Sequence, residues 1–196
     1  MRIEEQIFMN EMNSTIESAK RKIRKEIKGI KETYSYQQKK EMSIPILEKL
    51  ELLPEFIQAK TIMLYWSMKD EVYTHDFVVK WAQKKKVILP SVKGNTLDLK
   101  VFHGLENLIE GENYGIPEPE GPIFMNEDDI DLILIPGVAF DKNNNRMGRG
   151  KAYYDRLLNS LSAFKIGACF EFQVLGQVPV EKHDIRMDCV LCESSK

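Results

Sequence analysis

The sequence has few of the features that mark secreted, membrane or metal-cluster proteins. Its 196 residues include three cysteines, which cannot all pair within one chain, so a secreted disulfide framework is not expected. No apolar run approaches the roughly 20 residues that span a bilayer. The first residues carry several acids and no apolar core, which argues against a signal peptide and a mitochondrial presequence. We therefore expect a cytoplasmic protein.

Neither sign of charge dominates, and several familiar motifs are missing. The net charge of −2 gives no global attraction to nucleic acid or membrane. There is no Walker A loop, no G-x-S-x-G, no H-E-x-x-H and no dinucleotide-binding glycine motif in its strand context. Cys189-x-x-Cys192 lacks a second ligand pair, so a metal or redox role is not expected. His75 and His103 have no partner visible in the sequence and are expected to be structural or surface residues.

The N-terminal part predicts two helices. Residues 1–19 form an N-terminal extension that we expect to be flexible, with residues 1–13 either disordered or a loosely packed extra helix. Ser14 begins an S-x-x-E capping pattern, and the helix that follows is expected to end near residues 29–31. Ser35 begins a second helix that is expected to run through about Leu50, although Pro45 should break or kink it.

Apolar segments of strand length follow Pro54. We expect strands at residues 61–66, 87–89, 97–103, 131–135, 163–170 and 188–191. Helices are expected between them, one capped by Thr74 and one around residues 152–161, whereas residues 111–122 read as a turn-rich crossing loop. This alternation implies an α/β protein with a largely parallel sheet and ligands at the carboxyl ends of its strands.

The most informative segment is residues 136–156, PGVAFDKNNNRMGRGKAYYDR, between an expected strand and an expected helix. Gly148 and Gly150 let the backbone approach an anion closely, and a helix N-terminus favours phosphate. The basic side chains are Arg146, Arg149 and Lys151. From the residues alone, a phosphate site and a solvated basic loop are both open interpretations.

This segment resembles the signature of the 5-formyltetrahydrofolate cyclo-ligases (methenyltetrahydrofolate synthetases), PG-[VL]-[AG]-FD-x-x-G-x-R-[LM]-G-x-G-x-G-YYD. Asn144 and Ala152 replace glycines of that signature. Asn tolerates left-handed backbone, whereas Ala152 is expected to tighten its turn or change how closely a ligand approaches. The resemblance covers residues 20–192. It implies one cyclo-ligase-like domain over residues 20–196, with a three-layer, largely parallel Rossmann-like sheet and helices on both faces, of the NagB/RpiA/CoA-transferase kind.

Other parts of the chain resemble the same family in the same order. Lys20-Arg21-x-x-Arg24 resembles its K-R-x-x-R element, in a stretch from Lys20 to Lys40 with a local charge of +7. Without the resemblance, a solvated amphipathic face is the favoured interpretation of that stretch. The segment 66–71, WSMKDE, resembles the substrate element S-x-x-x-E. The remaining elements are the G-I-x-E-P loop within residues 114–119 and the F-x-x-Q, VP and HD pattern within residues 170–184.

The resemblance implies ATP-dependent cyclisation of 5-formyltetrahydrofolate to 5,10-methenyltetrahydrofolate through a phosphorylated formyl group, with ADP and phosphate released. ATP contacts are implied for Lys20, Arg21, Arg24, Arg146, Met147, Gly148, Arg149, Gly150, Lys151, Ala152, Tyr153 and Tyr154. Substrate contacts are implied for Trp66, Glu71, Arg149, Gly150, Lys151, Ala152 and Tyr153. The implied catalytic residues are Lys151, Tyr153 and Arg149, and the implied Mg²⁺ ligands are Asp155 and Asp184.

Two alternatives remain open from the sequence. One is another ATP- or phosphate-dependent protein on the same sheet, with a folate site altered around Ala152 or Trp66. The other is a non-catalytic nucleotide- or RNA-binding module that uses the basic N-terminal face, which salt-sensitive binding without ATP turnover would favour. We expect ATP and 5-formyltetrahydrofolate, polyglutamylated or not, as partners, without nucleic acid or membrane. A monomer is expected because no long apolar heptad stretch occurs.

Overall fold

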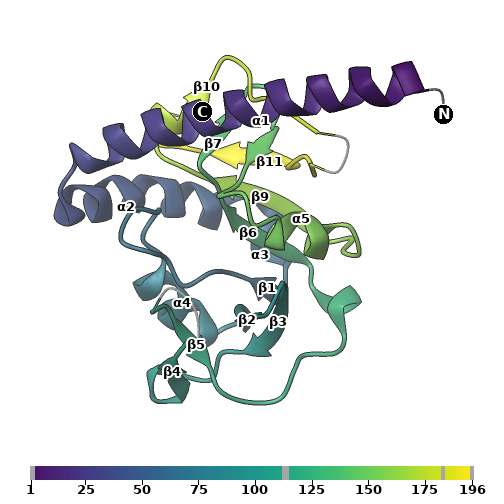
Figure 1. The fold of residues 1–196 in the computed structure, drawn as a ribbon. Helices are drawn as coiled ribbons and strands as arrows, with labels where there is room; N and C mark the ends of the chain where they lie inside the picture. The colour runs from purple at the N-terminus through teal and green to yellow at the C-terminus, as the bar shows by residue number, and fades with distance from the viewer. Residues whose placement is uncertain (1–2, 112–114, 182–183, 195–196) are drawn as a thin grey trace.

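The centre of the molecule is a six-stranded sheet in the order β11–β9–β6–β1–β2–β3 (Figure 1). The computed structural model describes residues 3–111, 115–181 and 184–194, with side chains from residue 14 onward. The strands of this sheet are β1 Thr61–Met63, β2 Lys86–Lys93, β3 Thr96–Val101, β6 Leu132–Pro136, β9 Phe164–Ala168 and β11 Cys189–Leu191. All neighbouring strands are parallel except β2 and β3. The expected largely parallel α/β sheet is therefore confirmed.

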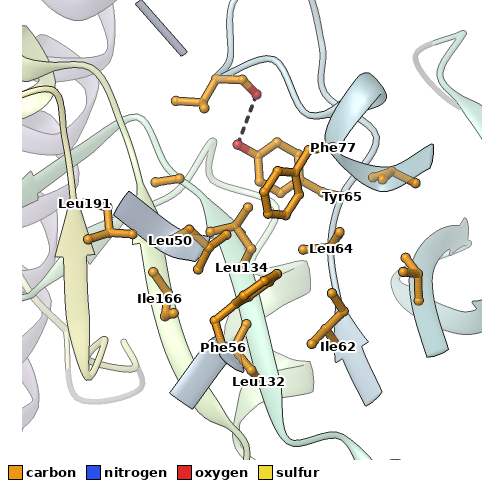
Figure 2. Packing of buried hydrophobic residues seen from close by; sticks show 14 of the residues in the cluster. Leu50, Phe56, Ile62, Leu64, Tyr65, Phe77, Leu132, Leu134, Ile166 and Leu191 are labelled. Atoms are coloured by element: carbon orange, nitrogen blue, oxygen red, sulfur yellow. Dashed lines mark hydrogen bonds between the residues drawn. The ribbon is translucent and has the colours of Figure 1, made fainter. Parts of the chain in front are cut away.

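Helices cover both faces of the sheet. The helices are α1 Ile3–Glu32, α2 Tyr36–Leu52, α3 Pro54–Gln58, α4 His75–Ala82 and α5 Tyr153–Leu158. Ile62 of β1 packs with Leu50 of α2 and Phe56 of α3 in one core cluster (Figure 2). Its neighbour Met63 belongs to a second cluster with Leu157 of α5. Adjacent strand residues point to opposite faces, so the two clusters lie on opposite sides of the sheet and the fold has three layers.

Two small sheets border this core. One has the order β10–β7–β8, from Val174–Leu175, Ala139–Asp141 and Arg146–Met147, and the other pairs β4 Leu108–Glu110 with β5 Pro117–Pro119. Single 3-10 turns lie at Leu105–Asn107, Glu127–Asp129 and Glu171–Gln173. Ile27 of α1 packs with Ala139 of β7 and Met147 of β8. Helix α1 is thereby fixed against the sheet that leads into the glycine-bearing loop, residues 148–152.

The helices depart from the sequence prediction at two points. Helix α1 runs without a break from Ile3 to Glu32, so the predicted start at Ser14 is wrong. A capping pattern matters only where a helix begins, and here the helix begins eleven residues earlier. Pro45 lies inside α2 without ending it, because Ile46 and Leu50 are fully buried and their packing offsets the lost backbone bond. The capping box predicted at Ser35 is present.

The strands also differ in length from the prediction. β1 ends at Met63 rather than at residue 66, whereas β2 continues through Pro90 to Lys93. After Ile88, no strand in the described part of the chain pairs with β2 on its β1 side, and such an edge tolerates a proline, which lacks an N–H. The predicted crossing loop contains β5.

Thr74 occupies the N-cap position of α4, as predicted. Its hydroxyl donates to the carbonyl oxygen of Tyr65 (2.5 Å) instead of capping the helix, so the position is right and the predicted capping bond is wrong. No helix in the described part of the chain is long and apolar enough to cross a membrane.

Candidate functional site

A cavity lies where the chain reverses its direction of travel across the sheet. From β1 the chain moves to β2 on one side, and it later returns to place β6 on the other side. Such a switch point opens a crevice at the carboxyl ends of the strands, where α/β proteins bind ligands. The wall of the cavity includes Trp66 and Glu71 after β1, Gly137 after β6, and Lys151 and Tyr153 beyond β8. The structure thus brings together residues that are far apart in the sequence.

The glycine-bearing loop, residues 148–152, is held by α1. Arg24 Nε donates to the carbonyl oxygen of Gly148 at 3.1 Å. Gly150 has a φ of +98°, and a Cβ there would lie 3.4 Å from the Arg24 guanidinium. Glycine is therefore required at Gly150 for its backbone conformation, and it also permits the close approach of Arg24. Arg24, which the resemblance implies as an ATP contact, thus joins α1 to this loop.

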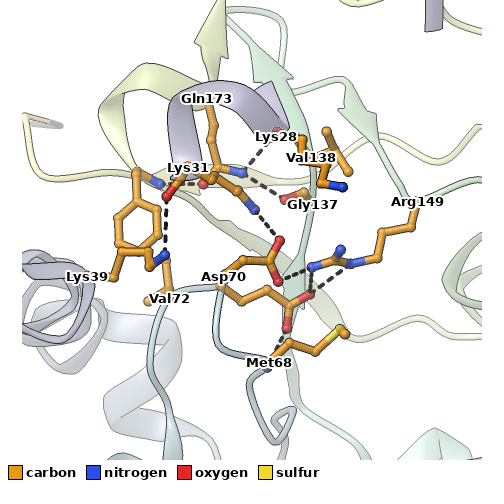
Figure 3. Close-up of polar contacts among 12 residues, drawn as sticks. Lys28, Lys31, Lys39, Met68, Asp70, Val72, Gly137, Val138, Arg149 and Gln173 are labelled. Carbon is orange, nitrogen blue, oxygen red and sulfur yellow. Dashed lines mark hydrogen bonds and ion pairs between the residues drawn. The ribbon is translucent and has the colours of Figure 1, made fainter. Parts of the chain in front are cut away.

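The turn after β6 is fixed by Gln173, which the sequence identified only as part of F-x-x-Q. Its Nε2 donates to the carbonyl oxygens of Gly137 and Val138, both at 2.9 Å (Figure 3). Its Oε1 accepts the N–H of Phe170 at 3.0 Å, and the residue is 1% exposed. A buried amide with all these partners fixes the backbone at the cavity wall.

Arg149 and Glu71, both predicted substrate contacts, touch each other, and Arg149 also contacts Asp70 (Figure 3). Arg149 Nη2 lies 3.0 Å from Glu71 Oε1 and 2.7 Å from Asp70 Oδ1, and Nε lies 3.3 Å from Glu71 Oε1. Glu71 also accepts the Met68 N–H at 2.9 Å. Burial alone would lower the pKa of Arg149, but the charge of Glu71 and the contact with Asp70 raise it, so the guanidinium stays charged.

Arg146 and Asp155 form a buried ion pair. Arg146 Nη2 donates to Asp155 Oδ1 at 2.8 Å, and Nη1 donates to the Pro136 carbonyl oxygen at 3.2 Å. The two residues are 4% and 8% exposed, and Arg146 Nε is buried without a hydrogen-bond partner among the described residues. The pair connects the first turn of α5 to the end of β6. Breaking it would leave an uncompensated buried charge.

Lys20 and Asp184, predicted to bind phosphate and Mg²⁺ respectively, pair with each other. Lys20 Nζ lies 2.6 Å from Asp184 Oδ2 and 2.7 Å from Glu181 Oε2, and Lys20 is 6% exposed. These contacts tie α1 to the segment after β10. Arg21 is exposed, so the members of the K-R-x-x-R element have different environments.

The predicted magnesium ligands do not form a ready-made cage. Asp155 lines the cavity, whereas the Asp184 carboxylate lies against Lys20. No group of three or more His, Cys, Asp or Glu side chains suited to a metal was found in the described part of the chain. Mg²⁺ commonly binds through one or two carboxylates, substrate phosphates and water, so the donor set fits an ion that arrives with a nucleotide.

Lys151 and Tyr153 stand in different surroundings on the cavity wall. The Lys151 side chain is exposed, and its ammonium has no ion pair within the described residues. The Tyr153 hydroxyl donates to the Gly94 carbonyl oxygen at 3.3 Å, and the Arg156 guanidinium lies 5.5 Å from the centre of its ring. Burial raises the pKa of the neighbouring Tyr154, so that phenol is neutral at physiological pH.

Trp66 is held by a histidine for which the sequence showed no partner. The rings of Trp66 and His75 stack with centres 4.0 Å apart, and His75 Nε2 lies 2.9 Å from the Ser67 carbonyl oxygen. Burial lowers the pKa of His75 and favours the neutral ring. His75 therefore has a structural role in orienting a cavity residue.

Glu118, in β5, is a cavity residue that sequence reasoning did not single out. Its carboxylate accepts the Ser91 hydroxyl and the Val92 N–H, the latter at 3.0 Å, and it is 7% exposed. The only signal in the sequence was its place in the G-I-x-E-P loop. Tyr114 of that loop and His183 of the HD pair lie outside the described residues.

The two residues that replace signature glycines both adopt left-handed backbone. Asn144 has a φ of 61° and Ala152 a φ of 53°. The conformation expected for Asn144 is therefore confirmed. Left-handed backbone costs an alanine about 1–2 kcal/mol in the folded state. A glycine at this position would avoid that cost, and the greater conformational entropy of glycine in the unfolded chain would cancel only part of the gain.

Ala152→Gly is expected to raise the free energy of unfolding by about 0.5–1 kcal/mol, measured by urea denaturation. Ala19→Gly in the interior of α1 is the matched control, because the same change inside a helix should destabilise by about 1 kcal/mol. An Ala152→Gly protein less stable than the parent would contradict this account of the turn.

Comparison with known proteins gives a consistent set of relatives. Residues 16–193 match the model of the 5-formyltetrahydrofolate cyclo-ligase family. The 5-formyltetrahydrofolate cyclo-ligase of Mus musculus is 31% identical, with 92% of this chain and 97% of the relative covered. The solved 5,10-methenyltetrahydrofolate synthetase of Aquifex aeolicus has a TM-score of 0.81 and 36% identity, with 90% of each chain covered. That of Mycoplasma pneumoniae has a TM-score of 0.73 and 28% identity, with 89% of this chain and 99% of that chain covered.

Proposed function

The chain belongs to the 5-formyltetrahydrofolate cyclo-ligase family, and on that premise we propose that it uses ATP to convert 5-formyltetrahydrofolate to 5,10-methenyltetrahydrofolate, with release of ADP and phosphate. One observation carries the proposal beyond membership. A single cavity joins the glycine-bearing loop, with Arg149 and Lys151, to Trp66 and Glu71 at the end of β1. A loop suited to phosphate and a wall suited to a flat heterocycle therefore face the same space.

The proposed reaction transfers a phosphoryl group and then closes a ring. The formyl oxygen on N5 attacks the γ-phosphorus of ATP, and ADP leaves with the electrons of the broken P–O bond. N10 then attacks the activated carbon and loses its proton. Phosphate departs with the C–O electrons, which leaves a positive charge shared over N5, the carbon and N10. The protein must align these groups and neutralise the transferring phosphoryl group.

Five of the residues that line the cavity have proposed roles that suit their chemistry. Lys151 and Arg149 supply positive charge to the phosphoryl oxygens. Glu71 accepts hydrogen bonds from the donor-rich edge of the pterin, and Trp66 offers a flat apolar surface to the ring. Tyr153 lies near the formyl group. These assignments extend the family resemblance to this chain and remain proposals.

Mg²⁺ is proposed to enter with the ATP phosphates. Asp155 would hold it from the cavity wall, and the ion would neutralise part of the phosphate charge. Asp184 is proposed as the second carboxylate from the family resemblance alone. In the structure it contacts Lys20 and is not among the residues that line the cavity.

The test of the function is the absorbance of methenyltetrahydrofolate formed from 5-formyltetrahydrofolate. Three conditions are compared: Mg-ATP, ATP with excess EDTA, and no nucleotide. We expect product only with Mg-ATP. No product from folded protein that binds ATP would keep the nucleotide site and overturn the folate assignment. Product in EDTA at the full rate would instead overturn the role of Mg²⁺.

We also propose a cytoplasmic monomer that acts on small molecules, including polyglutamylated folates, and does not bind nucleic acid. The basic N-terminal face is less available to RNA than the sequence suggested, because Lys20 is buried in ion pairs and Arg24 holds the Gly148 carbonyl. Light scattering and salt-dependent RNA binding would test these points. A stable oligomer or tight, salt-sensitive RNA binding would contradict them.

A further inference from the structure

The orientation of the Arg149 side chain depends on other residues, because its own backbone segment is irregular. It lies between Gly148 and Gly150 in a loop without helix or strand structure. The side chain is 44% exposed, so packing does not fix the guanidinium either. The described contacts of the guanidinium are those with Asp70 and Glu71. These two acids therefore determine the orientation of the Arg149 guanidinium.

The two acids hold one edge of the guanidinium and leave another open. Arg149 Nε and Nη2 donate to the carboxylates, whereas Nη1 has no acceptor among the residues that the structure describes. A guanidinium presents five N–H donors in a fixed plane, so fixing the Nε and Nη2 side orients the Nη1 side. That free edge is available to a phosphate oxygen while the carboxylates stay in place.

Asp70 is better placed than Glu71 to provide this support. Its contact with Arg149 is the shortest of the three, at 2.7 Å. Glu71 is the acid proposed to bind the pterin, so it is shared with the substrate, whereas Asp70 does not line the cavity. Asp70 can keep its contact with Arg149 when the folate site fills.

Asp70 is in turn anchored by a buried lysine at the end of α1. Lys31 Nζ lies 3.4 Å from Asp70 Oδ2, and Lys31 is 4% exposed (Figure 3). The Lys31 carbonyl oxygen accepts from Lys39 Nζ of α2 at 3.2 Å. Burial lowers the pKa of Lys31, and the charge of Asp70 opposes that shift. A continuous line of contacts therefore runs from α2 through Lys31 and Asp70 to Arg149.

We propose that Asp70 is a positioning residue for phosphoryl transfer, which acts by orienting Arg149 and is itself fixed by Lys31. The proposal rests on the proposed function of the same site. It assigns Asp70 no contact with either substrate. Because the proposed role of Arg149 is at the phosphoryl oxygens rather than at the folate, loss of Asp70 should impair the use of ATP and spare the binding of folate.

The test is a double-mutant cycle of Asp70→Asn and Arg149→Ala. Asp70→Asn alone should lower kcat/KM for ATP about 10-fold and leave the dissociation constant of 5-formyltetrahydrofolate within about 2-fold of the parent. In the Arg149→Ala protein, Asp70→Asn should lower kcat/KM for ATP by less than about 2-fold, because the guanidinium that Asp70 orients is absent. An equal cost in both backgrounds, or a matching loss of folate binding, would overturn the proposal.

The same cycle read by ATP binding needs no turnover. Asp70→Asn should weaken ATP binding about 5-fold, and only while Arg149 is present. If the parent protein forms no methenyltetrahydrofolate, the proposed function fails, and this binding cycle still decides the role of Asp70. Additive losses of ATP binding would reject it.

Three further variants, the first of them a control, complete the test. Asp76→Asn removes an exposed acid that also pairs with a lysine, Lys40 at 3.7 Å, and should leave every readout unchanged. Lys31→Met should show part of the fall in kcat/KM for ATP that Asp70→Asn causes. Lys31→Arg should retain most of the parent kcat/KM, because it keeps a positive charge beside Asp70. Urea denaturation of each variant verifies that the parent fold is retained. A Lys31→Met protein that is folded and has the parent kcat/KM for ATP would remove Lys31 from the proposal.

Discussion

Lys151→Ala is expected to lower kcat for methenyltetrahydrofolate formation about 10²–10³-fold while the free energy of unfolding changes by less than about 0.5 kcal/mol. The other cations on the cavity wall are already engaged: Arg149 with two carboxylates and Arg146 with Asp155. Lys151 is exposed, and its ammonium has no ion pair within the described chain. It can turn to a phosphoryl oxygen without giving up a native contact, and its removal should not weaken the fold.

The measurement is steady-state kinetics with urea denaturation of the same preparations. Lys142→Ala is the matched control, since Lys142 is also exposed and lies in the same segment of the chain but does not line the cavity. It should retain the parent kcat. Lys151→Arg keeps the charge with a different geometry, and its kcat should lie between those of Lys151→Ala and Lys142→Ala. A folded Lys151→Ala protein with the parent kcat would remove Lys151 from the catalytic assignment.

The sheet was predictable because its signal is local. The run 131–135 is almost wholly apolar, and residues 132–135 are fully buried in β6 as expected of a parallel strand covered on both faces. The glycine-bearing loop was predictable for a similar reason, because a strand, two glycines and a helix start lie within one short segment. From these elements, the position of the cavity followed from the rule for open parallel sheets.

The pairing of charges was not predictable. Lys20 and Asp184 are 164 positions apart, and nothing in either segment indicates that they meet. The sequence supplied the residue types for phosphate and metal binding, but three-dimensional packing decided that Lys20 pairs with Asp184 and Arg146 with Asp155. Tertiary packing also carries α2 through Pro45 without the predicted break, although the two ends of this helix were predicted correctly.

Asp141→Asn is expected to lower the free energy of unfolding by about 3 kcal/mol. Asp141 is 2% exposed and accepts four hydrogen bonds, all at 2.9–3.0 Å. The donors are the N–H groups of Asn143, Asn145 and Val178 and the side-chain amide of Asn145. The carboxylate closes the β7–β8 turn and ties it to the segment after β10. An amide in its place turns an NH₂ group toward these donors.

The effect of Asp141 should also depend on pH in a defined direction. Burial alone would raise the pKa of Asp141, but the hydrogen bonds from Asn145, Val178 and Asn143 outweigh it and hold that pKa below its usual value. The unfolded carboxyl titrates near about pH 3.9, so its stabilisation is fully present above that pH. It is lost as the pH falls through the lower pKa of the folded state.

Urea denaturation as a function of pH measures both effects. The difference between the parent and Asp141→Asn should be constant from about pH 5 to 7 and shrink below about pH 4, because only the parent then takes up a proton at this site. Asp128→Asn removes an exposed acid and is the matched control, with an expected change under about 0.5 kcal/mol. A difference that instead grows toward low pH would mean that the folded protein binds the proton at Asp141 more tightly than the unfolded chain. The hydrogen-bond donors would then not be what stabilises the carboxylate, and the turn that leads into the glycine-bearing loop would need another explanation.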